Sequence, residues 1–381
     1  MLSRPLAVNN FVTMAPPAQS QAQLNLIRGV YSEVFDLETN HPAQWSPLKT
    51  VSQLQLSLLI TLLAMGIGCS SKQPFAPDEQ RLQSVTLMLN WYPEAEHGGF
   101  YAAKEHGIFE RYGLDVDIRP GGPNAPVAQE LVVGRVQFAI GNADDVLLFR
   151  NEGVPVVALM APIQNTPRCV LVRADSGVEQ LSGLKGFVLQ ANVGRPFLDF
   201  MRSAGLLEGV QVVPYGGSVA KLVTDKKTAI QAYSFSEPFM AKQQGVEVRS
   251  LMLSDVGYNP YASCLLANES YVKDHRDIVA RMVVACREGW QHYLQHPEAT
   301  NQAILAKNSQ GMTAEALAFG VSELKPLCLP EGLAPEQLGQ MSLPRWQQLV
   351  DQFIQLKLID GSKVQADQVF DSSFLDRTPN R

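Results

Sequence analysis

A strand, a helix and a second strand follow one another directly near residue 90. Apolar and polar residues alternate over residues 85–89 and stop at Asn90 and Trp91, as a strand does at the edge of a sheet. Apolar residues recur at helical spacing over residues 97–111, and alternation returns over residues 114–118. This succession predicts a βαβ unit. Because ligands of open α/β sheets collect beyond the carboxyl ends of the strands, we expect Asn90 and Trp91 to lie at a ligand site.

The strand and helix patterns continue through a second set and then return to the first. Continuously apolar runs predict buried strands at residues 154–160 and 169–172. Further strands are predicted at residues 187–189, 210–213, 229–233 and 261–267. From there to about residue 358 the pattern is helical. The chain is therefore predicted to be an α/β protein with two βα lobes joined by two crossing strands and a helical C-terminal part.

The order of the patterns also predicts the lobe boundaries. We place lobe I at residues 84–170 and 264–370, and lobe II at residues 171–263. The length of 381 residues and the hydrophobic content of 46% are sufficient for two domains. Two crossings form a hinge, and a cleft between such lobes closes around its ligand.

One local motif carries a family resemblance. Asn90-Trp91, then His97-x-Gly99-x-Tyr101-x-Ala103, then Gly113-Leu114-x-Val116, resembles the N-terminal signature of periplasmic solute-binding proteins of the NMT1/THI5-like class. The resemblance covers roughly residues 84–360 and implies a type II-like periplasmic-binding-protein fold. It also implies capture of a small solute for an ABC permease. That class serves importers of thiamine-precursor pyrimidines and riboflavin and, more distantly, of sulfonates and nitrate.

Polar and aromatic residues near predicted strand ends and helix starts make up the expected ligand site. These residues are Asn90, Trp91, His97, Tyr101, Asn142, Asn192, Ser218, Tyr233 and Glu237. Trp91 offers a flat face for stacking, and core packing is its alternative role. The resemblance suggests that Glu237 contacts amino or imide groups of the ligand, with a hydrogen-bonded turn as the alternative. Asn142 precedes two aspartates that are typical of a helix start, so its loop has either a capping or a ligand role.

The sequence has few motifs that are typical of catalysis. It has no phosphate-binding P-loop, no G-x-S-x-G and no H-E-x-x-H motif. The enzyme branch of the same class makes the thiamine pyrimidine and has a histidine in a similar segment, but also a cysteine-rich CCCFC-like motif that this chain lacks. We therefore predict a binding protein that is not an enzyme, with no cofactor and no metal, and interpret His97 as a loop residue near the ligand. A sulfonate or nitrate receptor and a THI5-type pyrimidine synthase are the alternatives.

The amino-terminal part predicts export. The apolar segment at residues 54–67 is shorter than the ~20 residues of a membrane span and is typical of a signal peptide. It ends before Cys69, as in a lipobox, although Gly66 stands where that motif usually has Leu. We predict an extension plus signal peptide at residues 1–68, lipidation of Cys69 and a tether at residues 69–83. The protein would then lie in the periplasm or at the extracytoplasmic face of the membrane; a plain secretory signal and a short anchor helix are the alternatives.

Charge and cysteine content restrict the partners. Lys plus Arg number 31 against 37 for Asp plus Glu, and there is no basic run, which argues against nucleic acid. The expected partners are a small heterocyclic ligand, an ABC permease and the membrane, and we expect a monomer. Cys169, Cys264, Cys286 and Cys328 lie in apolar runs and are predicted to be buried free thiols. Since both lie at the crossings, Cys169 and Cys264 form the one candidate disulfide.

Overall fold

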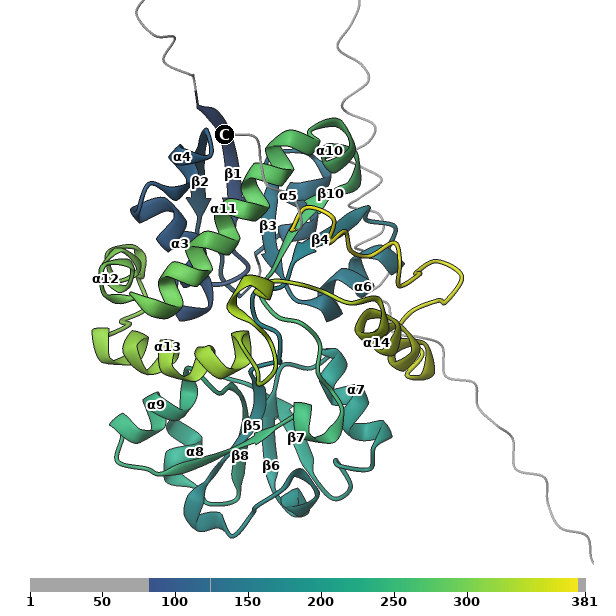
Figure 1. Ribbon diagram of the computed structural model, residues 1–381. Helices are drawn as coiled ribbons and strands as arrows, with labels where there is room; N and C mark the ends of the chain where they lie inside the picture. The colour runs from purple at the N-terminus through teal and green to yellow at the C-terminus, as the bar shows by residue number, and fades with distance from the viewer. Residues whose placement is uncertain (1–81, 124, 376–381) are drawn as a thin grey trace, which may run out of the picture. The chain divides into compact units, whose positions relative to one another are not determined.

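Two five-stranded mixed sheets form the framework of the protein (Figure 1). A computed structural model describes residues 82–123 and 125–375, so the predictions for residues 1–68 and for Cys69 lie outside the described residues. The first sheet has, in spatial order, β2 (Leu114–Arg119), β1 (Gln83–Met88), β3 (Phe138–Gly141), β10 (Cys264–Asn268) and β4 (Val156–Met160). The second has β7 (Gln211–Pro214), β6 (Val188–Ala191), β8 (Thr228–Tyr233), β5 (Arg168–Arg173) and β9 (Val248–Met252).

The two sheets share one topology. In the first, β1 runs parallel to β2 and β3, and β10 runs antiparallel to β3 and β4. In the second, β6 runs parallel to β7 and β8, and β5 runs antiparallel to β8 and β9. The chain passes between the sheets after β4 and again after β9. This arrangement confirms the α/β two-lobed fold; the exact residues at which the lobes hinge stay a prediction.

Helices cover both sheets and extend to the C-terminal part. Those of the first sheet and the C-terminal part are η1 (Ala95–His97), α3 (Gly98–Glu105), α4 (Ile108–Arg111), α5 (Val127–Val132), α6 (Ala143–Asn151), α10 (Glu269–Asp274), α11 (Arg276–Gln295), α12 (Glu298–Lys307), α13 (Ala314–Cys328), η5 (Pro335–Gln337) and α14 (Leu343–Gln355). Those of the second sheet are η2 (Ala174–Ser176), η3 (Leu181–Leu184), α7 (Pro196–Ser203), α8 (Ala220–Thr224), α9 (Glu237–Gln243) and η4 (Ser254–Val256). The packing is closest between α3 and α11, where a Cβ atom on Gly99 would lie 2.0 Å from Cγ of Trp290.

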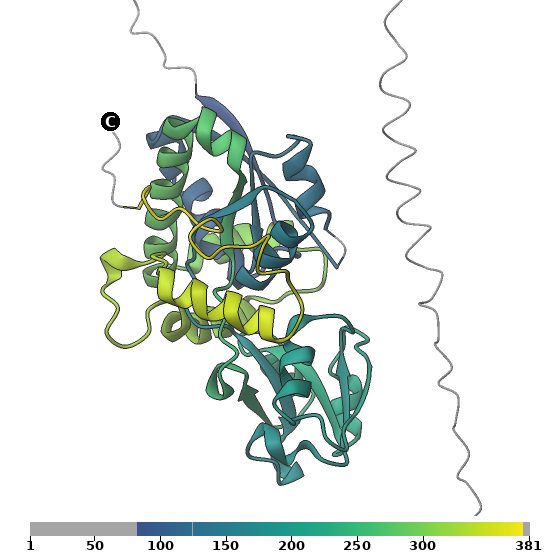
Figure 2. The ribbon, with the colours of Figure 1, turned by 90° about the vertical axis from the view of Figure 1, so that its right-hand side faces the viewer.

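Helix α13 lies between the two sheets in Figure 1, and the turned view of Figure 2 shows the yellow C-terminal helix α14 near the junction of the lobes. It contacts η1, which follows the first strand, and α9, which follows β8. The ring of Phe319 lies 5.5 Å from that of Phe239 on α9, and Gly320 lies against Ala95 of η1. The helical C-terminal part therefore holds together the two segments that flank the candidate site.

The structure departs from the sequence patterns at three places. The helix predicted over residues 97–111 is divided, because Gly107 takes a left-handed φ of 63° and separates α3 from α4, while His97 is the last residue of η1. An aspartate such as Asp274 is typical of a helix start, but it is the last residue of α10; His275 is the N-cap of α11, which begins at Arg276. Strand β9 was not predicted at all, since it is a half-buried edge strand without a clear alternation.

The four cysteines of the described chain are buried free thiols. Cys169 lies in β5 of the second sheet and Cys264 in β10 of the first, and no disulfide joins them. The candidate pairing is therefore wrong, and the expectation of buried thiols is confirmed. Burial raises the pKa of both thiols, which keeps them protonated and unreactive.

Candidate functional site

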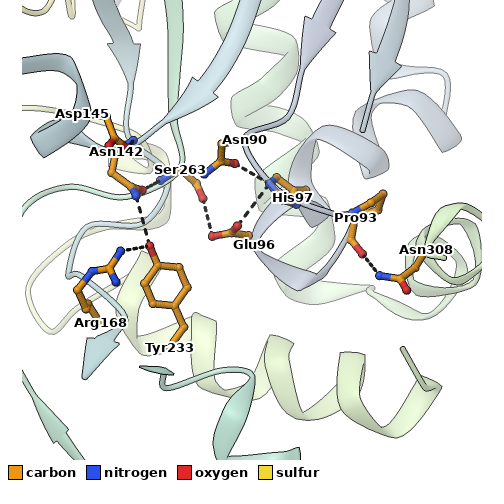
Figure 3. A network of polar contacts seen from close by, with 10 residues as sticks. All are labelled: Asn90, Pro93, Glu96, His97, Asn142, Asp145, Arg168, Tyr233, Ser263 and Asn308. Carbon is orange, nitrogen blue, oxygen red and sulfur yellow. Dashed lines mark hydrogen bonds and ion pairs between the residues drawn. The ribbon is translucent and has the colours of Figure 1, made fainter. Parts of the chain in front are cut away.

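Residues from several strand ends meet in one polar network between the sheets (Figure 3). Asn90 and η1 follow β1, and Asn142 follows β3. From the second sheet come Arg168 at the start of β5 and Tyr233 at the end of β8. The carboxyl ends of parallel strands thus converge as the fold requires, and they bring together residues that are far apart in sequence.

Asn142 connects the two sheets. Its side-chain oxygen accepts the backbone N–H of Ser263 at 3.1 Å, which directs its amide nitrogen toward the hydroxyl of Tyr233 at 3.3 Å. Arg168 Nη2 donates to the same hydroxyl at 2.8 Å. Because the oxygen of Tyr233 accepts two hydrogen bonds, its own proton remains to be donated to a third group. Burial raises the pKa of Tyr233 to about 12, so that proton is retained at neutral pH.

Ser263 occupies a strained position beside this connection. Its φ is 49°, in the left-handed region that residues other than glycine rarely adopt, and its side chain is fully buried. Its hydroxyl donates to Glu96 Oε2 at 3.4 Å while its N–H reaches Asn142. Strain of this kind persists where surrounding contacts fix the backbone, and it is frequent at ligand sites.

Asn90, His97 and Glu96 form the other end of the network. His97 Nε2 lies 3.0 Å from Asn90 Oδ1 and 3.5 Å from Glu96 Oε1. Burial lowers the pKa of His97 to about 3, so the imidazole is neutral and carries its proton on Nε2, between two acceptors. The contact of His97 with Glu96 is therefore made by a neutral ring and is not an ion pair. Through its two contacts His97 orients Asn90 and Glu96.

Three carboxyl groups converge beside the network. Glu94 and Glu96 are 8% and 1% exposed, and the side chain of Glu94 has no hydrogen-bond partner within the described chain. Glu237 Oε2 accepts the backbone N–H of Tyr233 at 2.8 Å. Burial and mutual repulsion raise the pKa of Glu96 to about 7, and burial also raises the pKa values of Glu94 and Glu237. With a pKa of about 7, Glu96 is partly protonated at neutral pH and can then donate as well as accept a hydrogen bond.

A second link between the sheets is an ion pair. Arg195, just before α7, lies 3.2 Å from Asp145 of α6, and both side chains are mostly buried. Asp145 also accepts the backbone N–H of Asn142 in the capping box that starts α6. The helix-start role expected here is thus confirmed, with Asn142 as the capping residue.

Five of the nine predicted site residues meet in or beside this network: Asn90, His97, Asn142, Tyr233 and Glu237. Two of them occupy different elements than expected. His97 lies in the buried helix η1 rather than in a loop, because the apolar residues around it pack into the core of the first sheet. Glu237 is the first residue of α9 rather than part of a turn without a helix, since Pro238 fits the first helical turn.

Among the described residues, the other four predicted site residues have no hydrogen bond to the network. Tyr101 is 4% exposed in the core around α3, and its hydroxyl has no partner within the described chain. Trp91 is 39% exposed, and its ring centroid lies 5.3 Å from that of Tyr92 in an edge-to-face arrangement. Asn192 and Ser218 are exposed, and the Ser218 hydroxyl accepts the N–H of Ala220. Their role in ligand binding stays a prediction.

Four residues of the site were missed: Glu94, Glu96, Arg168 and Ser263. The acidic pair is detectable in principle, because two carboxylates at alternate positions lie directly between a strand end and an apolar helix. Arg168 and Ser263 carry no local signal. They become site residues because β5 and β10 run antiparallel beside β8 and β3, so that their starts lie at the edge where those strands end.

A surface hollow of about 590 Å³ lies elsewhere, lined by α4, α11 and η5. The rings of His106 and His292 approach to 4.0 Å there, beside the ion pair between Arg111 and Glu288. In the part of the chain that the structure describes, no group of three or more His, Cys, Asp or Glu residues is placed to hold a metal ion. The hollow shares no residue with the polar network.

Comparison with known proteins relates this geometry to a family. The sequence profile described as NMT1/THI5 like matches residues 94–300. The chain is 27% identical over 264 residues to the formylaminopyrimidine-binding protein of Halalkalibacterium halodurans, covering 67% of this chain and 79% of that protein. It is 24% identical over 314 residues to the riboflavin-binding protein RibY of Chloroflexus aurantiacus, covering 77% and 84%. The solved structure of the periplasmic aliphatic sulphonate binding protein SsuA from Escherichia coli superposes with a TM-score of 0.57 at 18% identity, covering 75% of this chain and 91% of that one, and shows the fold alone.

Proposed function

We propose that this chain, which belongs to the NMT1/THI5-like family, captures a small flat nitrogen heterocycle between its two sheets and delivers it to an ABC permease. A pyrimidine-type thiamine precursor is the preferred ligand, and a flavin is the next. The observation that carries the proposal is the convergence of Glu94, Glu96 and Glu237 with Asn142 and Tyr233. The similarity to a formylaminopyrimidine-binding and a riboflavin-binding protein supports it.

The chemistry of the carboxyl groups suits an aminopyrimidine edge. A protonated carboxyl donates through its O–H and accepts through its carbonyl oxygen, so it can pair with a ring nitrogen and the adjacent amino group together. Burial raises the pKa values of Glu94, Glu96 and Glu237, and that of Glu96 rises to about 7, so the protonated form of Glu96 is available near neutral pH. The O–H of Tyr233 supplies a further donor.

The sulfonate or nitrate alternative fits these residues less well. An anion placed beside three carboxyl groups would be repelled whenever one of them ionises. The likeness to the sulphonate-binding protein is one of fold. The synthase alternative requires a chemically active histidine, whereas His97 is buried, neutral and held between Asn90 and Glu96. We therefore propose binding without catalysis, and absence of pyridoxal absorbance in the purified protein is the corresponding check.

Calorimetry with a ligand panel tests the proposal. Aminopyrimidines and flavins are expected to bind, and taurine and nitrate are not. Trp91→Ala should weaken heterocycle binding roughly ten- to a hundredfold, because base–aromatic stacking is worth ~1–3 kcal/mol. Tight binding of taurine or nitrate that is indifferent to Trp91→Ala would replace the proposal with the anion receptor.

We also propose export and lipid anchoring at Cys69, with association of a monomer with the permease. Within residues 82–123 and 125–375 no helix combines the length and the apolar composition of a membrane span. Cys69→Ser should release the protein from the membrane fraction or stall its processing, since the lipid cannot then be attached. Unchanged mass and unchanged membrane association in Cys69→Ser would leave an uncleaved anchor helix as the explanation.

Closure is the last part of the proposed mechanism. The lobes at 84–170 with 264–370 and at 171–263 are expected to rotate about the two crossings, with the ligand favouring the closed state. Small-angle scattering should then give a smaller radius when the aminopyrimidine is bound. Tight binding without any change of radius would contradict the hinge.

A further inference from the structure

Arg168 is a deeply buried cation without a paired anion. It is 7% exposed, and no other lysine or arginine in the described part of the chain is as buried. No carboxylate oxygen of the described residues lies within 4.0 Å of its guanidinium. Since burying a charge without a partner is costly, its position calls for a partner that the folded chain does not supply.

The guanidinium lies against two aromatic rings, and most of its N–H donors have no partner among the described residues. Its central carbon lies 5.0 Å from the ring centroid of Phe197 and 4.8 Å from that of Tyr233, so both rings support it. Of its five N–H donors, the described part of the chain uses one Nη2–H, which donates to the Tyr233 hydroxyl at 2.8 Å. A planar fork fixed in this way is prepared to bind an oxygen acceptor.

The charges around Arg168 indicate which kind of oxygen acceptor its guanidinium would bind. The charge of Arg168 lowers the pKa values of Glu96 and Glu237 against the larger effect of burial, so these carboxyl groups lie near it without pairing. Arg195 is already paired with Asp145. The neighbourhood is richer in carboxyl groups than in guanidinium groups, which disfavours a fully anionic substituent and favours a neutral carbonyl-type oxygen.

We propose that Arg168 determines specificity by binding a carbonyl-type oxygen on a substituent of the heterocyclic ligand, while the carboxyl groups pair with the ring edge. This inference rests on the proposed function, because it assumes that a heterocycle occupies the network. The inference adds one requirement to the proposed function: the ligand is a heterocycle with an oxygen acceptor on its side group.

The test is calorimetry with two matched ligands. One is an aminopyrimidine with a formylamino substituent, and the other is the same aminopyrimidine with an alkyl group of equal length. The full-length protein should bind the first roughly ten- to a hundredfold more tightly, as a hydrogen bond to a charged group predicts. In Arg168→Met, which keeps the apolar stem between the rings, this ratio should fall to about threefold or less.

Two further variants keep the result interpretable. Arg168→Lys retains the charge without the fork and should give an intermediate ratio. Arg202→Met removes an exposed arginine that pairs with Asp199 on α7, and it should leave the ratio unchanged. A ratio that persists in Arg168→Met and Arg168→Lys overturns this inference and leaves the proposed function intact. Failure of both pyrimidines to bind the unmodified protein overturns the proposed function and this inference with it.

Discussion

Asn90 and Asn192 occupy equivalent places in the two sheets and opposite environments. Each follows the second strand of its sheet, β1 or β6, in the shared strand order. Asn90 is half-buried, and its side chain bonds to His97 at 3.0 Å. Asn192 is exposed, and within the described residues only its backbone is hydrogen-bonded: its N–H donates to Gln231 at 2.7 Å and its carbonyl accepts from Arg195. Topology thus determines where a loop lies, and the segment after the strand determines what the loop can do. After β1 the chain folds back into the buried helix η1; after β6 it stays at the surface until α7.

The largest effect expected from this contrast is on the packing behind η1. Gly99→Ala should lower the free energy of unfolding by about 3 kcal/mol, because the new Cβ would lie 2.0 Å from Trp290 in a close-packed core. The matched change beside the second sheet, Gly216→Ala, meets nothing within 4 Å and should stay within about 0.5 kcal/mol. Urea denaturation of both variants measures the difference. Equal costs would mean that the two sides are packed alike.

The second largest effect concerns the pH dependence of the free energy of unfolding, which should differ between the region of Glu96 and the surface of the second sheet. Burial raises the folded-state pKa of Glu96 from 4.5 to about 7, so its favourable contribution is complete below pH 4.5 and is lost as the pH rises to about 7. At about 1.4 kcal/mol per pKa unit the loss is up to about 3 kcal/mol. Glu96→Gln should flatten this decline in denaturation midpoints.

Asp175 is the control for that measurement. It lies at the surface beside β5, where hydrogen bonds from Arg173 and Lys226 lower its pKa. Because it is ionised in both the folded and the unfolded state above pH 4.5, Asp175→Asn should leave the slope between pH 4.5 and 7 unchanged. An equal change of slope in both variants would show that Glu96 does not titrate as its burial requires.

Ligand affinity provides a third comparison, now within the second sheet. Glu237→Ala should weaken aminopyrimidine binding roughly ten- to a hundredfold, since it leaves a ligand donor unpaired at ~1–3 kcal/mol. Thr224→Ala, at an exposed position on α8 whose hydroxyl bonds only to carbonyl groups of its own helix, should change the affinity by less than about twofold. Titration calorimetry distinguishes the two. A loss of affinity in Thr224→Ala equal to that in Glu237→Ala would show that the effect of Glu237→Ala is not specific to the polar network.

The smallest expected effect concerns the stability of variants at Asn90 and Asn192. Asn90→Ala removes one acceptor of His97 Nε2, and the contact with Glu96 at 3.5 Å remains, so the loss of stability should be about 1 kcal/mol. Asn192→Ala should stay within about 0.5 kcal/mol. Thermal unfolding of the two variants in parallel is the measurement. A larger effect at Asn192 would reverse the contrast described above.

The fold was predictable because its strands carry strong local patterns. The buried strands β4, β5, β8 and β10 are apolar runs, and their order along the chain implies two sheets with two crossings. The half-buried edge strand β9 carries no such pattern, since only one of its five residues is buried. A local pattern also does not reveal where a helix breaks, as Gly107 shows.

The site was predictable only where residues adjoin strand ends. Asn90, Asn142 and Tyr233 satisfy that rule and meet in the network. Arg168 begins a strand, and Ser263 precedes one, so their roles follow from the antiparallel pairing of β5 with β8 and of β10 with β3. Tyr101 shows the converse, because its place in the motif suggested a contact with ligand while its helix face packs into the core.

The strand order affects how the protein folds while the ribosome is synthesising it. The second sheet is built from β5 to β9, one uninterrupted stretch from Arg168 to Met252. The first sheet begins earlier in the chain but has β10, residues Cys264–Asn268, between β3 and β4. Domains fold during synthesis as their residues emerge, and long-range strand pairing is slow. The second sheet can therefore complete its folding first. The facing edges of β3 and β4 stay unpaired until β10 has been synthesised.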